Sequence, residues 1–156
     1  LNCTLVGDGD IEMLKQLVIK LDLLDEVSFA GGIYGKDLHP ILMDSDIMVY
    51  PGGIGLSLAH ALSFGIPVIT TDNKLLHGPE IELLQEGQTG DYFKDNDAID
   101  LADKLHAWHI KLHKSATQIS AACMNSIKEH QYLPEKVASA AIQFIKGKMV
   151  NKETLV

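Results

Sequence analysis

Short apolar runs alternate with segments of helical periodicity along this chain, and glycines mark the change from one to the other. In VYPGGIGLSLAHALSFGIPVIT, residues 49–70, an apolar run ends at Pro51 and three glycines follow within four positions. Apolar residues then recur at helical spacing until Gly65, and a second apolar run, IPVITT, comes directly afterwards. Closely joined strand, helix and strand segments favour a right-handed crossover between parallel strands.

The same alternation continues on both sides of this stretch. Strands are predicted at residues 1–6, 26–30, 46–51, 66–71 and 92–93. Helices are predicted at residues 11–21, 36–45, 56–64, 96–113, 114–130 and 133–150, with a further short helix that starts near Pro79. The expected fold is therefore α/β: a doubly wound, Rossmann-like parallel sheet with helices on both faces. We expect one domain at residues 1–150 and a flexible tail at 151–156.

Length and composition limit the class of protein. A chain of 156 residues with 46% apolar residues can bury the core of one domain. No apolar run approaches the roughly 20 residues of a membrane span. The net charge of −8 argues against nucleic acid as a partner. Cys3 and Cys123 lie far apart and indicate neither a disulfide framework nor a zinc site, so a cytoplasmic protein is expected.

The basic residues carry a sharper constraint, because all 13 of them are lysines. Arginine is the side chain best suited to bidentate binding of phosphate or carboxylate, and this sequence contains none. An anion site here must therefore use backbone amides, helix ends, lysine or a partner. The sequence also begins without methionine and enters a strand pattern at once, so we expect an excised domain.

The glycine turn before residue 56 has two interpretations. Gly52, Gly53 and Gly55 let a phosphate or diphosphate approach the backbone, and the following helix start favours negative charge. Alternatively, the glycines serve only a tight turn and close packing. The spacing matches neither G-x-G-x-x-G nor G-x-x-x-x-G-K-[ST], so the glycines alone leave both interpretations open.

Other polar patterns favour structural roles. His106, His109 and His113 share one helix face and could in principle bind a metal, but no cysteine or acid pair completes a site, so we expect none. Ser57 lies in G-L-S-L-A, which differs from the G-x-S-x-G of a nucleophile elbow.

Taken in order, the motifs resemble a known family. LVGDGD after a strand, L-x-x-x-V-x-F-x-G, D-I-M-V-Y-P, G-I-G-L-S-L-x-H-A-L-x-F-G-I-P-V-I-T and E-G-Q-T-G follow one another as in the nucleotide-binding half of GT-B glycosyltransferases. The resemblance is closest to the retaining glycosyltransferase family 4 and covers residues 1–110. It implies that this chain is the C-terminal, donor-binding half of such an enzyme, without the N-terminal acceptor domain.

The resemblance also implies roles for particular residues. The family motif E-G-F-G-L lies against the diphosphate and sugar of the donor, and a segment after the second strand lies beside the base. The implied diphosphate and sugar contacts are Gly52, Gly53, Ile54, Gly55, Leu56 and Ser57, the base-adjacent residues are Gly31, Ile33 and Tyr34, and the cleft loop contains Gly7 and Gly9.

Both acidic positions of the family motif are changed here. The first glutamate, which contacts the donor sugar, aligns with Gly52, and the second, which contacts the ribose, aligns with His60. A histidine still offers a hydrogen bond to a ribose hydroxyl. Glu80 follows Pro79 where the family has a P-E pair, and it is either a replacement contact or a helix-start carboxylate. His77 is a further candidate ligand contact.

The function implied is retaining transfer of a hexosyl group from a nucleoside diphosphate sugar to the hydroxyl of a sugar or lipid-linked acceptor. The expected setting is polysaccharide or glycoconjugate biosynthesis, without a cofactor or metal and with peripheral membrane contact as an option for the full-length protein. In the family, an arginine and a lysine upstream of the first motif stabilise the leaving diphosphate, so this segment alone should be inactive. The alternative is a noncatalytic nucleotide-binding module that has lost both glutamates.

Overall fold

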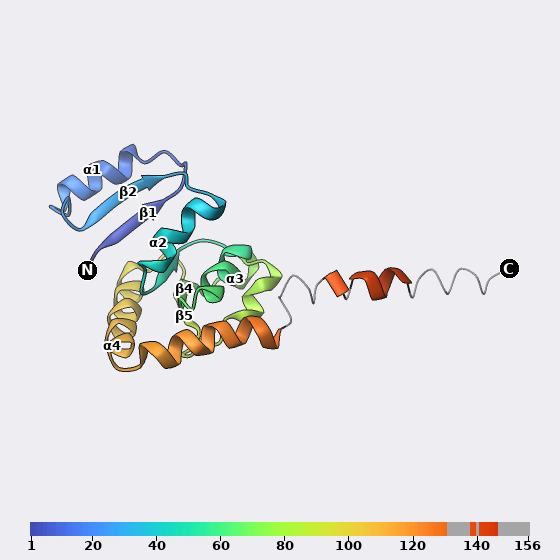
Figure 1. The fold of residues 1–156 in the computed structure, drawn as a ribbon. Coiled ribbons are helices and arrows are strands. Elements are labelled where there is room, and N and C mark those ends of the chain that lie inside the picture. Colours follow the sequence, from blue (N-terminus) through green and yellow to red (C-terminus); the bar gives the residue numbers. More distant parts are fainter. Residues whose placement is uncertain (131–137, 140, 147–156) are drawn as a thin grey trace. The chain divides into compact units, whose positions relative to one another are not determined.

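The computed structural model describes residues 1–130, 138–139 and 141–146 (Figure 1). The chain divides into two compact units, Leu1–Met43 and Asp44–Val156. Of the helix predicted at residues 133–150, residues 138–139 and 141–146 are described and are helical, while the other ten lie outside the described residues. The tail predicted at residues 151–156 also lies outside them.

The first unit is built around two parallel strands. Its elements are β1 (Cys3–Val6), α1 (Glu12–Lys20), β2 (Val27–Gly31), the 3-10 helix η1 (Gly35–Leu38) and α2 (His39–Met43). The register pairs Cys3 with Val27 and Leu5 with Phe29, and it shifts after Leu5. This unit has little core of its own: within residues 1–43, all of them described, Val18 and Leu42 are the only buried residues.

The second unit holds a three-stranded parallel sheet in the order β3-β4-β5. Its elements are β3 (Met48–Tyr50), α3 (Leu56–Ser63), β4 (Val68–Thr71), the 3-10 helices η2 (Lys74–Leu76) and η3 (Pro79–Leu83), β5 (Gly90–Phe93) and α4 (Ala98–Glu129). Strand β4 is central and all four of its residues are buried. A strand paired on both edges and covered on both faces requires the continuous run of β-branched residues that the sequence has here.

Helix α3 covers this sheet with an apolar face. Leu58, Ala61 and Leu62, spaced by three and four residues, are each 0% exposed. The helix ends at Ser63 with Phe64 as its C-cap, and the φ of +76° at the following Gly65 is the left-handed conformation of a helix C′ position. The N–H of Ile66 then bonds the carbonyl of Ala61 at 3.1 Å, which turns the chain directly into β4.

Helix α4 is long and bent, and it contacts both α3 and β5. It begins at Asp97, whose carboxylate accepts the N–H groups of Ile99 and Asp100 at 3.1 Å each. Its backbone leaves helical geometry at Ser115, where φ is −145° and ψ is 28°, and Figure 1 shows the change of direction. The sequence predicted two helices that meet between residues 113 and 114, one residue before this kink.

The observed architecture confirms the predicted α/β class and its parallel strands. The first unit contains the two-stranded sheet β1-β2, and the second contains the three-stranded sheet β3-β4-β5. In the part of the chain that the structure describes, no helix is both long and apolar enough for a bilayer crossing.

Candidate functional site

The predicted glycine turn lies between the carboxyl end of β3 and the start of α3. Gly55 is the N-cap of α3 and supplies no side-chain cap, while its carbonyl accepts the N–H of Leu58 at 2.9 Å. The amides of Leu56 and Ser57 lie in the first turn, where a helix has no backbone acceptor for them. Both residues are exposed. The end of this strand thus presents donors and the positive end of a helix dipole to the surface.

The three glycines of the turn differ in what surrounds them. A Cβ atom on Gly53 would lie 2.1 Å from the carbonyl oxygen of Leu76, so packing requires glycine there. A Cβ atom on Gly52 would meet nothing within 4 Å, and one on Gly55 would meet only a Glu80 carboxylate oxygen at 3.6 Å. The tight-packing interpretation therefore accounts for Gly53 but leaves Gly52 and Gly55 without a packing requirement.

Strand β4 and the segment after η2 form hydrogen bonds with the turn. The buried Thr70 hydroxyl donates to the carbonyls of Tyr50 at 2.8 Å and Gly52 at 3.2 Å. The N–H of Ile54 donates to Nδ1 of His77 at 3.2 Å, and the N–H of Gly78 donates to the carbonyl of Ile54 at 2.9 Å. The side chain of Ile54 is buried, with 1% exposed. The turn is therefore preorganised by the protein itself.

A network of hydrogen bonds links the residues at the carboxyl ends of β4 and β5. Asp95 accepts a hydrogen bond from the Thr71 hydroxyl at 2.9 Å and from the Asn73 amide at 3.0 Å. These bonds, that of Asn73 first, lower the pKa of the Asp95 carboxyl below its usual 3.8. The N–H of Asp95 in turn donates to Asp72 at 2.9 Å. The network fixes the loop that leads from β4 to His77.

The two remaining candidates of this unit lie on either side of the turn. The Glu80 carboxylate is beside Gly55 and Gly78, 2.5 Å from where a Cβ atom of Gly78 would stand. His60 is half-buried in α3, with its ring edge-on to Phe64 at a centroid distance of 5.5 Å. Their ligand contacts remain predictions, as does that of His77, whose two ring nitrogens both contact backbone atoms.

The predicted cleft loop and base-adjacent segment come together in the first unit. The N–H of Gly7 donates to the carbonyl of Gly31 at 2.9 Å, and the Tyr34 hydroxyl donates to Asp8 at 2.5 Å. This hydrogen bond, and then the charge of Asp8, raises the pKa of Tyr34 above 10.0. A hollow beside them is lined by Gly7, Gly9, Gly31, the acidic Asp10 and neighbouring apolar residues. Ile33, adjacent in the chain, is half-buried.

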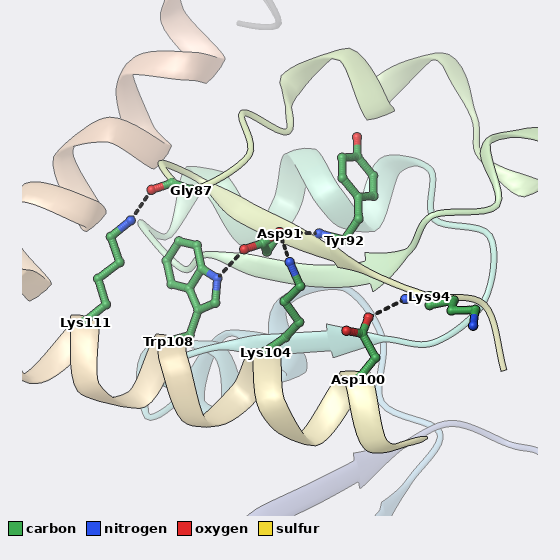
Figure 2. Close-up of polar contacts among 8 residues, drawn as sticks. All are labelled: Gly87, Asp91, Tyr92, Lys94, Asp100, Lys104, Trp108 and Lys111. Carbon is green, nitrogen blue, oxygen red and sulfur yellow. Dashed lines mark hydrogen bonds and ion pairs between the residues drawn. The ribbon is translucent and has the colours of Figure 1, made fainter. Parts of the chain in front are cut away.

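Sequence reasoning missed a cluster that attaches α4 to β5. Figure 2 shows the Asp91 carboxylate between two side chains of α4, accepting from Nζ of Lys104 at 3.0 Å and from Nε1 of Trp108 at 3.4 Å. The hydrogen bond to Asp91 raises the pKa of Lys104. Lys111 donates to the carbonyl of Gly87 and lies over the Trp108 ring, 4.8 Å from its centroid. The signal was faint, because Asp91 is the single charged residue in a strand of only four residues, GDYF.

Metal binding has no support from the geometry of the described residues. Among them, no group of three or more His, Cys, Asp or Glu side chains could hold an ion. The rings of His109 and His113 contact each other edge-on at 4.6 Å on an exposed stretch of α4.

Comparison with known proteins gives a family match. Residues 1–109 match the sequence model of the family described as "Glycosyl transferases group 1". The chain is 30% identical over 114 residues to WcaL of Escherichia coli strain K12, whose name describes a colanic acid biosynthesis glycosyltransferase. That alignment covers 67% of this chain and 27% of WcaL. The chain thus spans about a quarter of the length of the curated relatives it matches.

Solved structures share the fold at lower sequence identity. Sucrose-phosphate synthase of Thermosynechococcus elongatus matches with a TM-score of 0.77 and 20% identity, over 95% of this chain and 38% of that protein. HepE of Anabaena, solved in complex with UDP, matches with a TM-score of 0.66 and 20% identity, over 89% of this chain and 41% of that protein. These neighbours have the Rossmann-like GT-B fold, which the sequence predicted.

Proposed function

The chain belongs to the family of group 1 glycosyl transferases, and from that premise we propose that it binds the diphosphate of a nucleoside diphosphate sugar at the turn between β3 and α3. The nucleotide sugar is the donor substrate, and no cofactor is needed. The rest of the protein supplies the acceptor domain and the arginine that this chain, whose 13 basic residues are all lysines, lacks.

One observation carries the proposal: Gly52 and Gly55 keep open Cβ positions at a helix start that has no side-chain cap. A glycine that packing does not require is explained if a ligand approaches the backbone there. The amides of Gly55, Leu56 and Ser57 then donate to phosphate oxygens, and the dipole of α3 favours their charge. Because Thr70 and His77 already hold the turn, binding the diphosphate requires little rearrangement.

Other residues around the turn suit the sugar and ribose. Glu80 carries its carboxylate beside Gly55 and is placed to accept hydrogen bonds from sugar hydroxyls, in place of the glutamate that Gly52 replaces. His60, one turn into α3, is the candidate for the ribose hydroxyls. Gly7, Gly9, Gly31, Ile33 and Tyr34 of the first unit remain candidates for contacts to the nucleoside.

For the whole enzyme, we propose retaining transfer of a hexosyl group to a hydroxyl acceptor in polysaccharide or glycoconjugate biosynthesis. The support is the name of WcaL, which refers to colanic acid biosynthesis, and the UDP bound to HepE. We propose a cytoplasmic location, metal independence, and an acceptor that is a sugar or is linked to a lipid.

A second candidate is a noncatalytic module that binds nucleotide without transferring sugar. The observation that favours it is the replacement of both family glutamates, by Gly52 and His60. An assay of the full-length protein distinguishes the two candidate functions. If the protein transfers sugar from any nucleotide sugar of a panel to an acceptor, the result supports the glycosyltransferase. If it binds nucleotide but transfers no sugar, the result supports the noncatalytic module.

Replacement of Gly55 by valine tests the diphosphate site. The isopropyl group would occupy the open position beside the amides of α3, so we expect at least a tenfold loss of UDP and pyrophosphate affinity, as several charge-assisted hydrogen bonds are blocked. Isothermal titration calorimetry on the full-length protein gives the affinities. Circular dichroism checks the fold.

Ser63→Val is the matched control, because it places the same side chain at the other, exposed end of α3. Its affinity should equal that of the wild type. If Gly55→Val also binds both ligands like the wild type while folded, the diphosphate does not bind at this turn and the assignment is wrong.

A further inference from the structure

His77 connects two parts of the backbone around the proposed diphosphate site. It lies between η2 and η3, where Nδ1 is 3.2 Å from the N–H nitrogen of Ile54 and Nε2 is 2.8 Å from the carbonyl oxygen of Thr71. An amide N–H can only donate and a carbonyl can only accept. The ring must therefore be neutral, with its proton on Nε2.

The bond to His77 is half of a two-point attachment. The next residue, Gly78, donates its N–H to the carbonyl of Ile54 at 2.9 Å, so consecutive residues hold both polar groups of Ile54. Leu76 packs its carbonyl against Gly53, and Gly78 lies against Gly55. The 76–78 segment thus follows the glycine turn closely along its length, and Nδ1 of His77 is the acceptor of the Ile54 N–H.

We infer that His77 is a positioning residue whose neutral ring fixes the glycine turn for diphosphate, so that protonation of the ring releases Ile54 and weakens binding. This inference rests on the proposed function. A protonated ring presents an N–H at Nδ1 to the N–H of Ile54, and two donors repel each other. The bond from Nε2 to the Thr71 carbonyl survives, and the turn keeps its bonds to Gly78 and Thr70, but the N–H of Ile54 loses its acceptor.

Titratable residues lie on each segment around the ring. They are Tyr92 of β5, with ring centroids 6.4 Å apart, Asp95, which accepts from the Thr71 hydroxyl, Glu80 beside Gly78, and Lys74, whose backbone carbonyl accepts the backbone N–H of His77 at 3.5 Å. Burial raises the pKa of Tyr92 above 10.0, and hydrogen bonds lower that of Asp95 below 3.8. Between pH 5.5 and 8, Tyr92 therefore stays neutral and Asp95 stays ionised.

Two amide variants separate the two bonds of the ring. In His77→Asn the side-chain oxygen stands about where Nδ1 stood, so the acceptor for Ile54 remains and cannot be protonated. In His77→Gln the longer side chain reaches toward Thr71 and leaves the Ile54 N–H without its acceptor. We expect pyrophosphate affinity at pH 8 to be about tenfold lower for His77→Gln than for His77→Asn.

The pH dependence of pyrophosphate affinity distinguishes this inference from a merely structural role of His77, which would leave that dependence the same in His77→Asn. Wild-type affinity for pyrophosphate, measured by calorimetry on the full chain, should fall from pH 8 to pH 5.5 more steeply than that of His77→Asn. Protonation of pyrophosphate itself affects both proteins equally and cancels in their ratio. Parallel profiles for the two proteins, or wild-type affinity in His77→Gln, would overturn the inference. If His77→Gln does not fold, the profile comparison decides alone.

A measurement without ligand separates this inference from the proposed function. Nitrogen-15 NMR should show an unprotonated Nδ1 and a protonated Nε2 on His77, and hydrogen exchange of the Ile54 amide should be faster in His77→Gln than in His77→Asn. Absence of pyrophosphate binding to the wild type would contradict the proposed function while these signals still report the attachment. Equal exchange in both variants would contradict the attachment itself.

Discussion

The two units of this molecule differ most in how much they bury. In the first unit, Met13, Ile19 and Leu24 are 75%, 61% and 64% exposed, and the sheet has two strands. In the second unit, Leu58 and Leu62 of α3 and Val68 of the central strand β4 are each 0% exposed. Burial of apolar surface is the main favourable term in folding, so the second unit carries most of the stability.

The predicted binding segments of the two units differ in the same way. The glycine turn of the second unit is held by Thr70, His77 and the buried Ile54, whereas Tyr34 of the first unit is 70% exposed and bonds the exposed Asp8. Segments with few buried contacts open with little free energy. We therefore expect the diphosphate turn to be formed before the ligand arrives, and the nucleoside-side segment to become more ordered on binding.

The two cysteines, one in each unit, give the largest predicted contrast. Cys3 is exposed on β1, and Cys123 is buried in α4, where burial raises its pKa to about 12. At pH 8 a thiol of that pKa is about 0.01% thiolate, and the thiolate is the reactive form. We expect Cys3 to react with a disulfide reagent roughly a thousandfold faster than Cys123, measured from the absorbance of the released thiol.

Cys3→Ser provides the control, because it should remove the fast phase and leave the slow one. The slow phase should approach the fast rate when urea unfolds the protein. Two equally fast phases in the native protein would mean that α4 does not cover Cys123.

A pair of identical substitutions compares the cores of the two units. Leu62→Ala in α3 removes a side chain that is 0% exposed, and we expect it to lower the free energy of unfolding by about 2–5 kcal/mol. Leu17→Ala in α1 removes one that is 47% exposed, and the expected loss is about 1 kcal/mol or less. Urea denaturation followed by circular dichroism measures both. Equal losses would show that the first unit has a core comparable to the second.

Sequence patterns predicted most elements because short-range signals define them. Apolar periodicity located α3 to within one residue, and the turn at Gly65 explains where that helix stops. The run IPVITT predicted the buried strand β4, since a strand covered on both faces has no polar alternation. Strand β5 begins two residues earlier than predicted, because it pairs with the whole length of β4.

Local sequence patterns could not predict the contacts that shape the candidate site. The ring of His77 bonds Ile54 across 23 residues, and the loop conformation, which the sequence does not encode in any local motif, decides which nitrogen accepts. The same holds for Asp91 and Trp108, which meet because α4 returns over β5. The three glycines looked equivalent in sequence, and only the position of Leu76 distinguished Gly53 from the other two.

The smallest expected effect is the pH dependence of folding stability. One hydrogen bond in the first unit is lost at high pH, and a network in the second unit is lost at low pH. The pKa of Tyr34 is raised by Asp8, so its hydrogen bond stabilises the folded first unit below about pH 10 and is lost as pH rises through the folded pKa. The pKa of Asp95 is lowered by Asn73 and Thr71, so its bonds stabilise the second unit above about pH 4 and are lost as pH falls through the folded pKa.

Urea denaturation of Tyr34→Phe and Asp95→Asn across pH tests both signs. The stability difference between wild type and Tyr34→Phe should be constant at neutral pH and shrink above pH 10, and that for Asp95→Asn should shrink below pH 4. Cys123 and Tyr92 also titrate in alkali, but they are common to wild type and variant and cancel in the difference. A difference for Asp95→Asn that stays flat in acid would mean that the bonds of Thr71 and Asn73 to the ionised Asp95 carboxylate do not stabilise the fold. The loop leading to His77 would then be held by its other contacts, such as the bond from Nε2 of His77 to the Thr71 carbonyl.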